Sequence, residues 1–211
     1  MNNKSRAVEI LNVLSTMYPN AGCELNYSTP FELLVAVILS AQCTDKRVNK
    51  VTSTLFTKYS TPQSFADIPQ ETLENEIYTC GFYRNKAKNI INASREILLN
   101  FNGEVPDTVE QLLTLSGVGR KTANVVYSVA FGGEAIAVDT HVFRVSHRLG
   151  LSDAATPDKT ELQLRECIPS QLWFSAHHLM IFHGRYTCSS QRPKCEACLL
   201  KNYCKINKGE S

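Results

Sequence analysis

Four of the chain's eight cysteines lie close together near its C-terminus, with six, two and five residues between them: Cys188, Cys195, Cys198 and Cys204. In a chain that opens without a secretion signal, thiols grouped in this way are typical of metal ligands, and a disulfide framework is the less common alternative. Zinc ribbons usually have two C-x2-C pairs set well apart, and here only Cys195 and Cys198 form such a pair. The spacing therefore favours an iron–sulfur cluster modestly and leaves zinc open. With either metal, the ordered loop would present Arg192 and Lys194 as cations.

A second stretch suited to chemistry is LLTLSGVGRKTANVV, residues 112–126, which has the pattern of a helix-hairpin-helix. Gly117 and Gly119 bracket Val118 between an apolar helix and a second helix that begins with Arg120. The glycines let the backbone turn tightly and approach an anion, and the N–H groups that open the second helix carry positive partial charge. The pattern predicts a contact with the DNA backbone that has little base preference. A plain loop with a C-cap glycine is the alternative.

Lys121, the next residue, could act as a nucleophile. An amine attacks an electrophilic sugar carbon only when it is unprotonated, and the helix N-terminus and Arg120 should lower the pKa of this side chain. A phosphate-binding lysine that faces solvent is the simpler interpretation of this segment alone.

A single carboxylate, Asp139, stands in the apolar stretch IAVDTHVFRV, residues 136–145. Its structural role would be the N-cap of the helix that follows. Its chemical role would be to stabilise a developing sugar cation and to move protons, and one residue can do both.

The elements that must position these residues are helices. Apolar residues recur at helical spacing in three stretches, 10–17, 48–59 and 90–98, and no sustained strand pattern competes with them. Thr29-Pro30-Phe31-Glu32 combines an N-cap hydroxyl, a proline at the first helical position and a glutamate for a capping box, and residues 107–110 repeat the device. Turn residues divide the chain into about ten short helices, which predicts an all-α fold.

Composition sets wider limits. The chain of 211 residues has a net charge of +2, too small to identify a nucleic-acid binder, although basic residues gather at 83–95 and 183–208 and form either DNA-facing or merely solvated surfaces. The most apolar run, residues 31–39, is too short for a bilayer span and predicts a buried helix. With no secretion signal, the sequence predicts a cytoplasmic protein, associated with the nucleoid if it is bacterial. In that compartment Cys23, Cys43, Cys80 and Cys167 are expected to be free thiols in or near the core.

In combination these motifs resemble the endonuclease III family of DNA glycosylases and apurinic/apyrimidinic (AP) lyases. The resemblance extends over nearly the whole chain: LLVAVILSAQCTD, GFYRNKAKNI, LSGVGRKTANVV, AVDTHVFRV and HGRYTCSSQRPKCEAC. It implies a [4Fe-4S] cluster on the four clustered cysteines, Lys121 as nucleophile and Asp139 as its partner. It also implies two helical domains flanking a DNA-binding cleft: a six-helix barrel-like domain at 22–133, and a cluster domain formed by 1–21 plus 134–211.

The resemblance also implies a set of DNA contacts: Gln42, Phe82, Gly117, Val118, Gly119, Arg120, His141, Arg192 and Lys194. Gln42 matches the glutamine that fills the gap left by the everted base. Two positions depart from the family. Phe82 replaces an intercalating leucine, which concerns the range of lesions, and Ser116 replaces a proline, which concerns the rigidity of the turn.

The function expected from these features is excision of oxidised pyrimidines from duplex DNA through a Lys121 Schiff base, followed by β-elimination 3′ to the abasic site. The expected partner of this monomer is double-stranded DNA that contains damaged pyrimidines or abasic sites, with no membrane involved. Two alternatives are a monofunctional mismatch glycosylase, which Lys121 disfavours, and a non-catalytic DNA-binding module built on a zinc loop.

Overall fold

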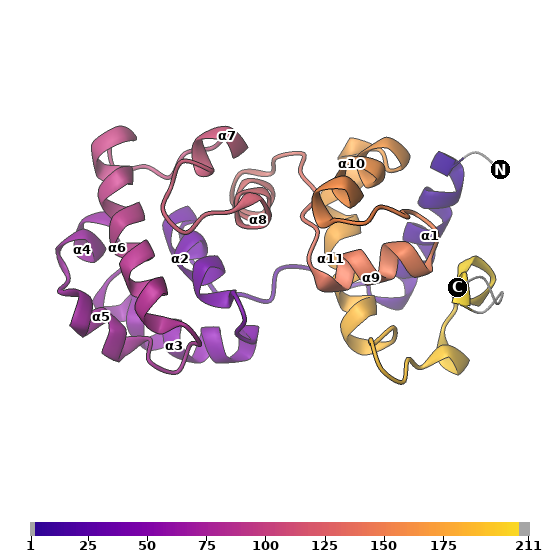
Figure 1. Cartoon of the computed structure of the whole chain (residues 1–211), viewed down its shortest axis with the longest axis horizontal. Coiled ribbons are helices and arrows are strands. Elements are labelled where there is room, and N and C mark those ends of the chain that lie inside the picture. Colours follow the sequence, from indigo (N-terminus) through magenta and orange to yellow (C-terminus); the bar gives the residue numbers. More distant parts are fainter. Residues whose placement is uncertain (1–2, 207–211) are drawn as a thin grey trace. The chain divides into compact units, whose positions relative to one another are not determined.

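The computed structural model describes residues 3–206, and the chain divides into two compact units. The hairpin unit comprises Glu24–Gly133, and the cysteine unit comprises the residues up to Cys23 together with those from Glu134 onward. The sequence predicts boundaries after residues 21 and 133. Helices account for all regular structure in the described residues, which confirms the predicted all-α fold (Figure 1). None of the described helices is long and apolar enough to cross a membrane.

The hairpin unit is built around one apolar helix. Its elements are α2 (Pro30–Ser40), α3 (Asp45–Lys58), α4 (Pro62–Asp67), α5 (Gln70–Glu76), α6 (Tyr83–Asn100), α7 (Val109–Leu112) and α8 (Arg120–Phe131). Every residue from Phe31 to Leu39 is buried, as predicted for the most apolar run, and α3, α6 and α8 pack around α2. A helix that is apolar on all sides is stable only inside a core. The buried face of α6, with Ile90 and Ile97 almost fully inaccessible, closes this core against α4 and α5.

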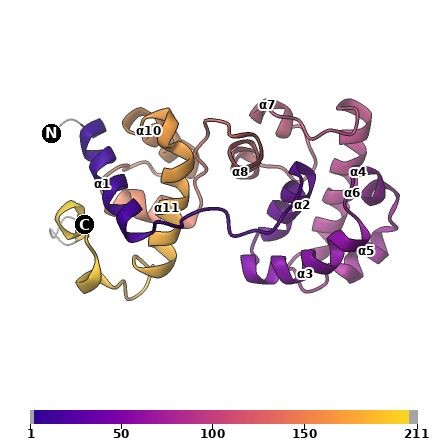
Figure 2. The same cartoon turned by 180° about the vertical axis from the view of Figure 1, so that it is seen from behind.

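The cysteine unit combines the first described helix with the C-terminal part of the described residues. Its elements are α1 (Asn3–Met17), α9 (Thr140–Arg148), α10 (Pro157–Cys167), η1 (Ser170–Leu172), α11 (Trp173–Tyr186), η2 (Cys195–Ala197) and η3 (Lys201–Tyr203). Figures 1 and 2 show α1 beside α11 and the C-terminal segment. Arg6 of α1 donates hydrogen bonds to the carbonyls of Leu149 and Tyr203, each at 2.8 Å. The Tyr203 hydroxyl in turn donates to Glu9 at 3.0 Å, so the first helix fixes the end of the cysteine loop.

Threonine side chains are the N-caps of several helices, including the two helix starts predicted at 29–32 and 107–110. Thr29, Thr61, Thr108 and Thr156 are N-caps whose side chains accept a hydrogen bond from the first turn. At α2 the predicted capping box takes a variant form, because the Glu32 carboxylate accepts from the N–H of Ser28 at 2.6 Å rather than from the N-cap residue. These caps satisfy donors that an isolated helix would leave unpaired.

Candidate functional site

The helix-hairpin-helix is formed by α7, the turn that follows it, and α8. Gly117 has φ +78°, and a Cβ added there would lie 2.7 Å from the Cβ of Asn89 on α6. The turn therefore needs glycine both for its conformation and for its packing. Gly119 is the N-cap of α8, and an added Cβ would meet no atom within 4 Å. The start of α8 thus has open space in front of it, as an approaching phosphate requires.

Lys121 lies in the first turn of α8, and its side chain is exposed. Arg120 precedes it and is also exposed, whereas Val118 is buried and donates its N–H to the carbonyl of Leu115 at 3.1 Å. The side chain of Val118 therefore packs into the core under the turn and is not available to a ligand. The two basic residues stand at the end of α8 where positive partial charge favours an anion.

Gln42 and Phe82 lie in two loops of the same unit. Gln42 is exposed and follows the C-terminal end of α2, and Phe82 is the N-cap of α6 with 64% of its surface exposed. Exposure leaves this aromatic side chain able to insert between bases, as the family resemblance implies. The two loops touch, because a Cβ at Gly81 would lie 3.6 Å from the carbonyl oxygen of Gln42.

Asp139 belongs to the cysteine unit and is the N-cap of α9, as its position in the sequence predicted. Its Oδ1 accepts from the N–H groups of His141 and Val142, both at 2.8 Å. Ile136, Ala137 and Val138 before it are buried, and the carboxylate itself is half-buried. Both cap bonds use one oxygen, so the cap accounts for only half of the carboxylate.

The helix that starts at Asp139 also holds the cysteine loop. His141 Nδ1 lies 3.2 Å from a guanidinium nitrogen of Arg144, and Arg144 donates to the carbonyl of Cys188 at 3.0 Å. Arg148, one turn later, donates to the Cys188 Sγ at 3.2 Å and to the carbonyl of Ser189 at 2.7 Å. Sequence reasoning missed both arginines, although their spacing of four residues places them on one face of α9.

The four clustered cysteines line one cavity, together with Arg148 and His183. The cavity has a volume of about 30 Å³, more than the roughly 10–15 Å³ that one water-sized sphere needs. Within residues 3–206, no three cysteine, histidine, aspartate or glutamate side chains converge closely enough to hold a single metal ion.

The histidines near the loop are packing and network residues. His177 Nδ1 and His178 Nδ1 donate to the carbonyls of Ala137 and Phe174, at 2.8 and 2.9 Å. His183 contacts the Tyr18 hydroxyl at 3.1 Å, and burial lowers its pKa to about 4. This ring also lies 3.8 Å from the Cys198 Sγ, a contact with the loop that the sequence did not indicate.

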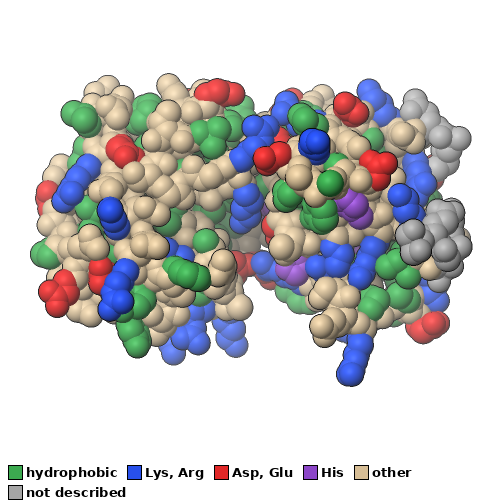
Figure 3. Space-filling model, in the orientation of Figure 1, with side chains coloured by type: hydrophobic (Ala, Val, Ile, Leu, Met, Phe, Trp, Pro, Cys, Tyr) green, Lys and Arg blue, Asp and Glu red, His purple; other side chains and the backbone are tan. Residues whose placement is uncertain are grey.

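Arg192 and Lys194 are exposed on the segment between the first two cysteines of the loop. Arg192 has φ +51°, an uncommon conformation for a residue with a side chain. Figure 3 shows Lys and Arg side chains at the surface of both units. One member of the predicted basic surface at 83–95 is buried: Lys86 is only 5% exposed, so it belongs to neither a DNA-facing nor a solvated surface.

Comparison with known proteins places the chain in a family. Residues 35–170 match the HhH-GPD superfamily of base excision DNA repair proteins. The chain belongs to this superfamily. Among its relatives, an endonuclease III of Synechocystis is 52% identical over 204 residues, which cover 95% of this chain and 92% of the relative. An endonuclease III of Bacillus subtilis is 51% identical over 198 residues, which cover 92% of this chain and 90% of the relative.

Solved structures agree with this HhH-GPD assignment. A trapped endonuclease III–DNA covalent intermediate, in an estranged-adenine complex, has a TM-score of 0.94 and 50% identity over 99% of both chains. The segment matched to the superfamily contains the α7–α8 hairpin and Asp139 and ends before the four cysteines. The cysteine loop lies outside that match.

Proposed function

We propose that this chain excises oxidised pyrimidines from duplex DNA with Lys121 as nucleophile and Asp139 as the assisting carboxylate. The chain is a bifunctional DNA glycosylase and AP lyase of base excision repair, and double-stranded DNA is its partner. The observation that carries the assignment of Lys121 is its position: the side chain is exposed in the first turn of α8, directly after the glycine turn. A relative 50% identical to this chain has been trapped covalently on DNA, which supports a nucleophilic mechanism.

The reaction needs one amine and one water. The unprotonated Lys121 Nζ attacks C1′ of the everted nucleotide while the bond from C1′ to the base breaks, and the electron pair leaves with the base, which takes up a proton. The nitrogen then loses a proton, its electron pair forms the C1′=N bond as the C1′–O4′ bond breaks, and O4′ takes up a proton, which gives the Schiff base. A proton then leaves C2′, the C3′–O bond breaks, and the 3′ phosphate departs. Water hydrolyses the Schiff base and frees Lys121.

Asp139 assists this sequence through charge and proton movement. Cationic character develops on the sugar as the base departs, and a half-buried carboxylate stabilises it more strongly than one in bulk water. The two N–H bonds to Oδ1 fix the orientation of the carboxyl group before DNA binds. The same residue therefore begins α9 and takes part in the reaction.

Eversion of the nucleotide costs a few kcal/mol and costs least where damage has already weakened stacking. We assign Phe82 to the wedge that separates the bases and Gln42 to the gap that the nucleotide leaves. The DNA phosphates are bound by the α8 N-terminus, Arg192 and Lys194. Contacts of this kind carry no sequence information. Selection of the lesion then comes from the cost of eversion and from the pocket that receives the base.

We assign a [4Fe-4S] cluster to the cavity between the four cysteines. All four cysteines line one cavity of about 30 Å³, which has room for more than one water-sized sphere and supports a multi-atom group, with one zinc ion as the alternative. Arg148 supports the assignment, because its guanidinium donates to the Cys188 Sγ at 3.2 Å and so orients a sulfur that would ligate the group. When bound, the group supplies structural order. The chain's own Arg192 and Lys194 contact DNA.

The cluster assignment is tested on purified protein without any assay of activity. We expect visible absorbance together with iron and acid-labile sulfide in equal amounts, and we expect all three to be lost in Cys198→Ser. A colourless protein that contains zinc would replace the cluster with the zinc alternative.

The nucleophile is tested by comparing the wild type with Lys121→Gln on a duplex that carries one thymine glycol. With borohydride present, the wild type is expected to form a covalent protein–DNA complex, and the variant is expected to form none while it still binds the duplex. Equal trapping of both proteins would refute the role of Lys121. Base release without a trapped complex in the wild type would indicate a monofunctional glycosylase, and binding with neither product would indicate the non-catalytic module.

A further inference from the structure

Four residues other than glycine have positive φ within residues 3–206, and two of them are the residues assigned to enter the duplex. Gln42 has φ +52° and Phe82 has φ +58°; the others are Asn102 and Arg192. A side chain in this conformation costs of order 1–3 kcal/mol and persists only when its surroundings hold it. The two loops therefore need a support that keeps Gln42 and Phe82 in place before DNA arrives.

Lys86, in the first turn of α6, contacts the backbone just before Gln42 and the carbonyl oxygen of Phe82. Its Nζ donates to the carbonyl oxygens of Leu39 at 2.9 Å and Ala41 at 2.6 Å. Its backbone N–H makes the first helical bond of α6, to the carbonyl oxygen of Phe82 at 3.1 Å, so the side chain begins one turn from Phe82. The carbonyl oxygen of Ala41 lies in the planar peptide group that joins Ala41 to Gln42. The hydrogen bond from the Lys86 Nζ therefore fixes the orientation of this peptide group, and with it the backbone at Gln42.

The position of the Lys86 ammonium group is favourable for this task. Leu39 and Ala41 lie at the C-terminal end of α2, where carbonyl groups lack partners within the helix and carry negative partial charge. A cation there caps α2 from the side of α6. One side chain thus joins the end of the helix that leads to Gln42 to the start of the helix that carries Phe82.

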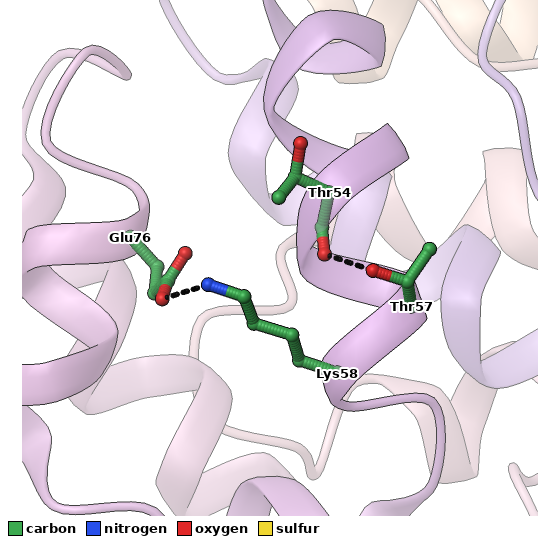
Figure 4. Close-up of polar contacts among 4 residues, drawn as sticks. All are labelled: Thr54, Thr57, Lys58 and Glu76. Atoms are coloured by element: carbon green, nitrogen blue, oxygen red, sulfur yellow. Dashed lines mark hydrogen bonds and ion pairs between the residues drawn. The ribbon is translucent and has the colours of Figure 1, made fainter.

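Burial shows that Lys86 serves the interior rather than the DNA surface. Its residue is 5% exposed, and burial lowers its pKa, with Cys80 and Cys43 as the neighbouring titratable groups. Lys58 in the same unit shows the contrast. Its Nζ lies 2.7 Å from Glu76 Oε1 in an ion pair that is open to solvent (Figure 4). A buried amine retains its place only where hydrogen bonds offset its desolvation, and here the acceptors are the carbonyls before Gln42.

We propose that Lys86 is a positioning residue for base eversion, which holds Gln42 and Phe82 ready to enter the duplex together. This role rests on the proposed function, because it has meaning only if the two residues act on DNA. It differs from a general contribution to stability in one respect. Removing Lys86 should lower the rate of excision because Gln42 is no longer held in position, so the effect should depend on the presence of Gln42. It also differs from a phosphate contact, since the side chain does not reach the surface.

A double-mutant cycle separates these roles. The proteins are the wild type, Lys86→Met, Gln42→Ala and the double variant, and the rate measured is excision from a duplex with one thymine glycol. We expect Lys86→Met to lower kcat/KM by about tenfold relative to the wild type. In the protein that already carries Gln42→Ala, we expect the same substitution to lower kcat/KM by less than about twofold. Independent effects, which multiply in the double variant, would overturn the proposal.

A second substrate gives a readout that a merely structural role would not separate. A single-stranded oligonucleotide with one abasic site has no opposite strand and no gap to fill, so its trapping by borohydride does not need Gln42. We expect Lys86→Met to reduce trapping on this substrate much less than excision from the duplex. A loss of equal size on both substrates would contradict the proposal.

Two control variants complete the design. Lys58→Met removes one lysine and one hydrogen bond from the same unit, and we expect it to behave as the wild type in both assays. Lys86→Arg keeps a cation with several donors, and we expect it to recover part of the duplex activity. If thermal unfolding shows that neither Lys86 variant is folded, Lys86 is required for the fold and the proposal fails. If the wild type itself does not excise the lesion, the proposed function fails first.

Discussion

Ser116 donates both its backbone N–H and its hydroxyl to the carboxylate of Glu96, at 2.7 Å to Oε2 and 2.7 Å to Oε1. Ser116 stands where the endonuclease III family usually has proline, which has neither of these donors. A proline ring stiffens a turn by fixing φ, and here two hydrogen bonds to α6 constrain the same turn from outside. Glu96 therefore offsets the loss of rigidity that the sequence predicts for this position.

Removing the hydroxyl should measure this constraint. We expect Ser116→Ala to lower the free energy of unfolding by about 1–2 kcal/mol, since hydrogen bonds to charged groups contribute more than neutral ones and this one is partly buried. Urea unfolding gives the value. Ser53→Ala is the control, because the Ser53 hydroxyl bonds only to its own helix and is exposed, and it should change stability by less than about 0.5 kcal/mol. A Ser116→Ala value as small as that of the control would mean that Glu96 does not constrain the turn.

The two hairpin glycines should respond differently to alanine. Gly117→Ala would place a Cβ 2.7 Å from that of Asn89 at a positive φ, so we expect a loss of roughly 1–3 kcal/mol in stability. Gly119→Ala meets no atom within 4 Å and should fold nearly as the wild type, with a cost below about 1 kcal/mol. Its methyl group would nevertheless hold a phosphate away from α8. Fluorescence anisotropy with a duplex that carries an abasic analogue should show weaker binding by Gly119→Ala, and unchanged binding would argue against a phosphate at this position.

The sequence predicted what depends on local chemistry. Threonine caps, the apolar α2 and the glycine turn each follow from residues a few positions apart, and the structure confirms them. The partners of Lys86, Arg148 and Glu96 lie 45 and 47, 40 and 20 residues away in the chain, and no periodicity encodes such distances. For this reason Lys86 was misread as a surface cation, and the ties from α9 to the cysteine loop were missed.

The cations of the cysteine loop should set part of the salt dependence of DNA binding. Each phosphate contact contributes about 0.9 to the slope of log K against log salt concentration, so we expect Arg192→Ala with Lys194→Ala to lower the slope by about 1–2. The change should be the same for duplexes of different sequence. Lys58→Met, which removes a cation paired with Glu76, should leave the slope as it is. A slope unchanged by the double substitution would exclude the loop from the interface.

The buried His178 should make stability depend on pH. Burial lowers its pKa below the ordinary value of 6.5, so below about pH 6.5 the unfolded chain binds a proton that the folded chain does not. The stability that this residue contributes is therefore complete above pH 6.5 and falls as the pH drops toward the folded-state pKa. Urea unfolding between pH 7.5 and 5 should show a smaller loss for His178→Gln than for the wild type. Identical losses would assign the pH dependence to other groups.

The most direct test of the account is to locate the covalent bond to DNA. The wild-type complex trapped by borohydride on a duplex with one thymine glycol is digested with protease and nuclease, and the modified peptide is identified by mass spectrometry. The account predicts that the sugar remnant is attached to the Lys121 Nζ, in the first turn of α8. A remnant attached to any other amine of the chain would contradict it.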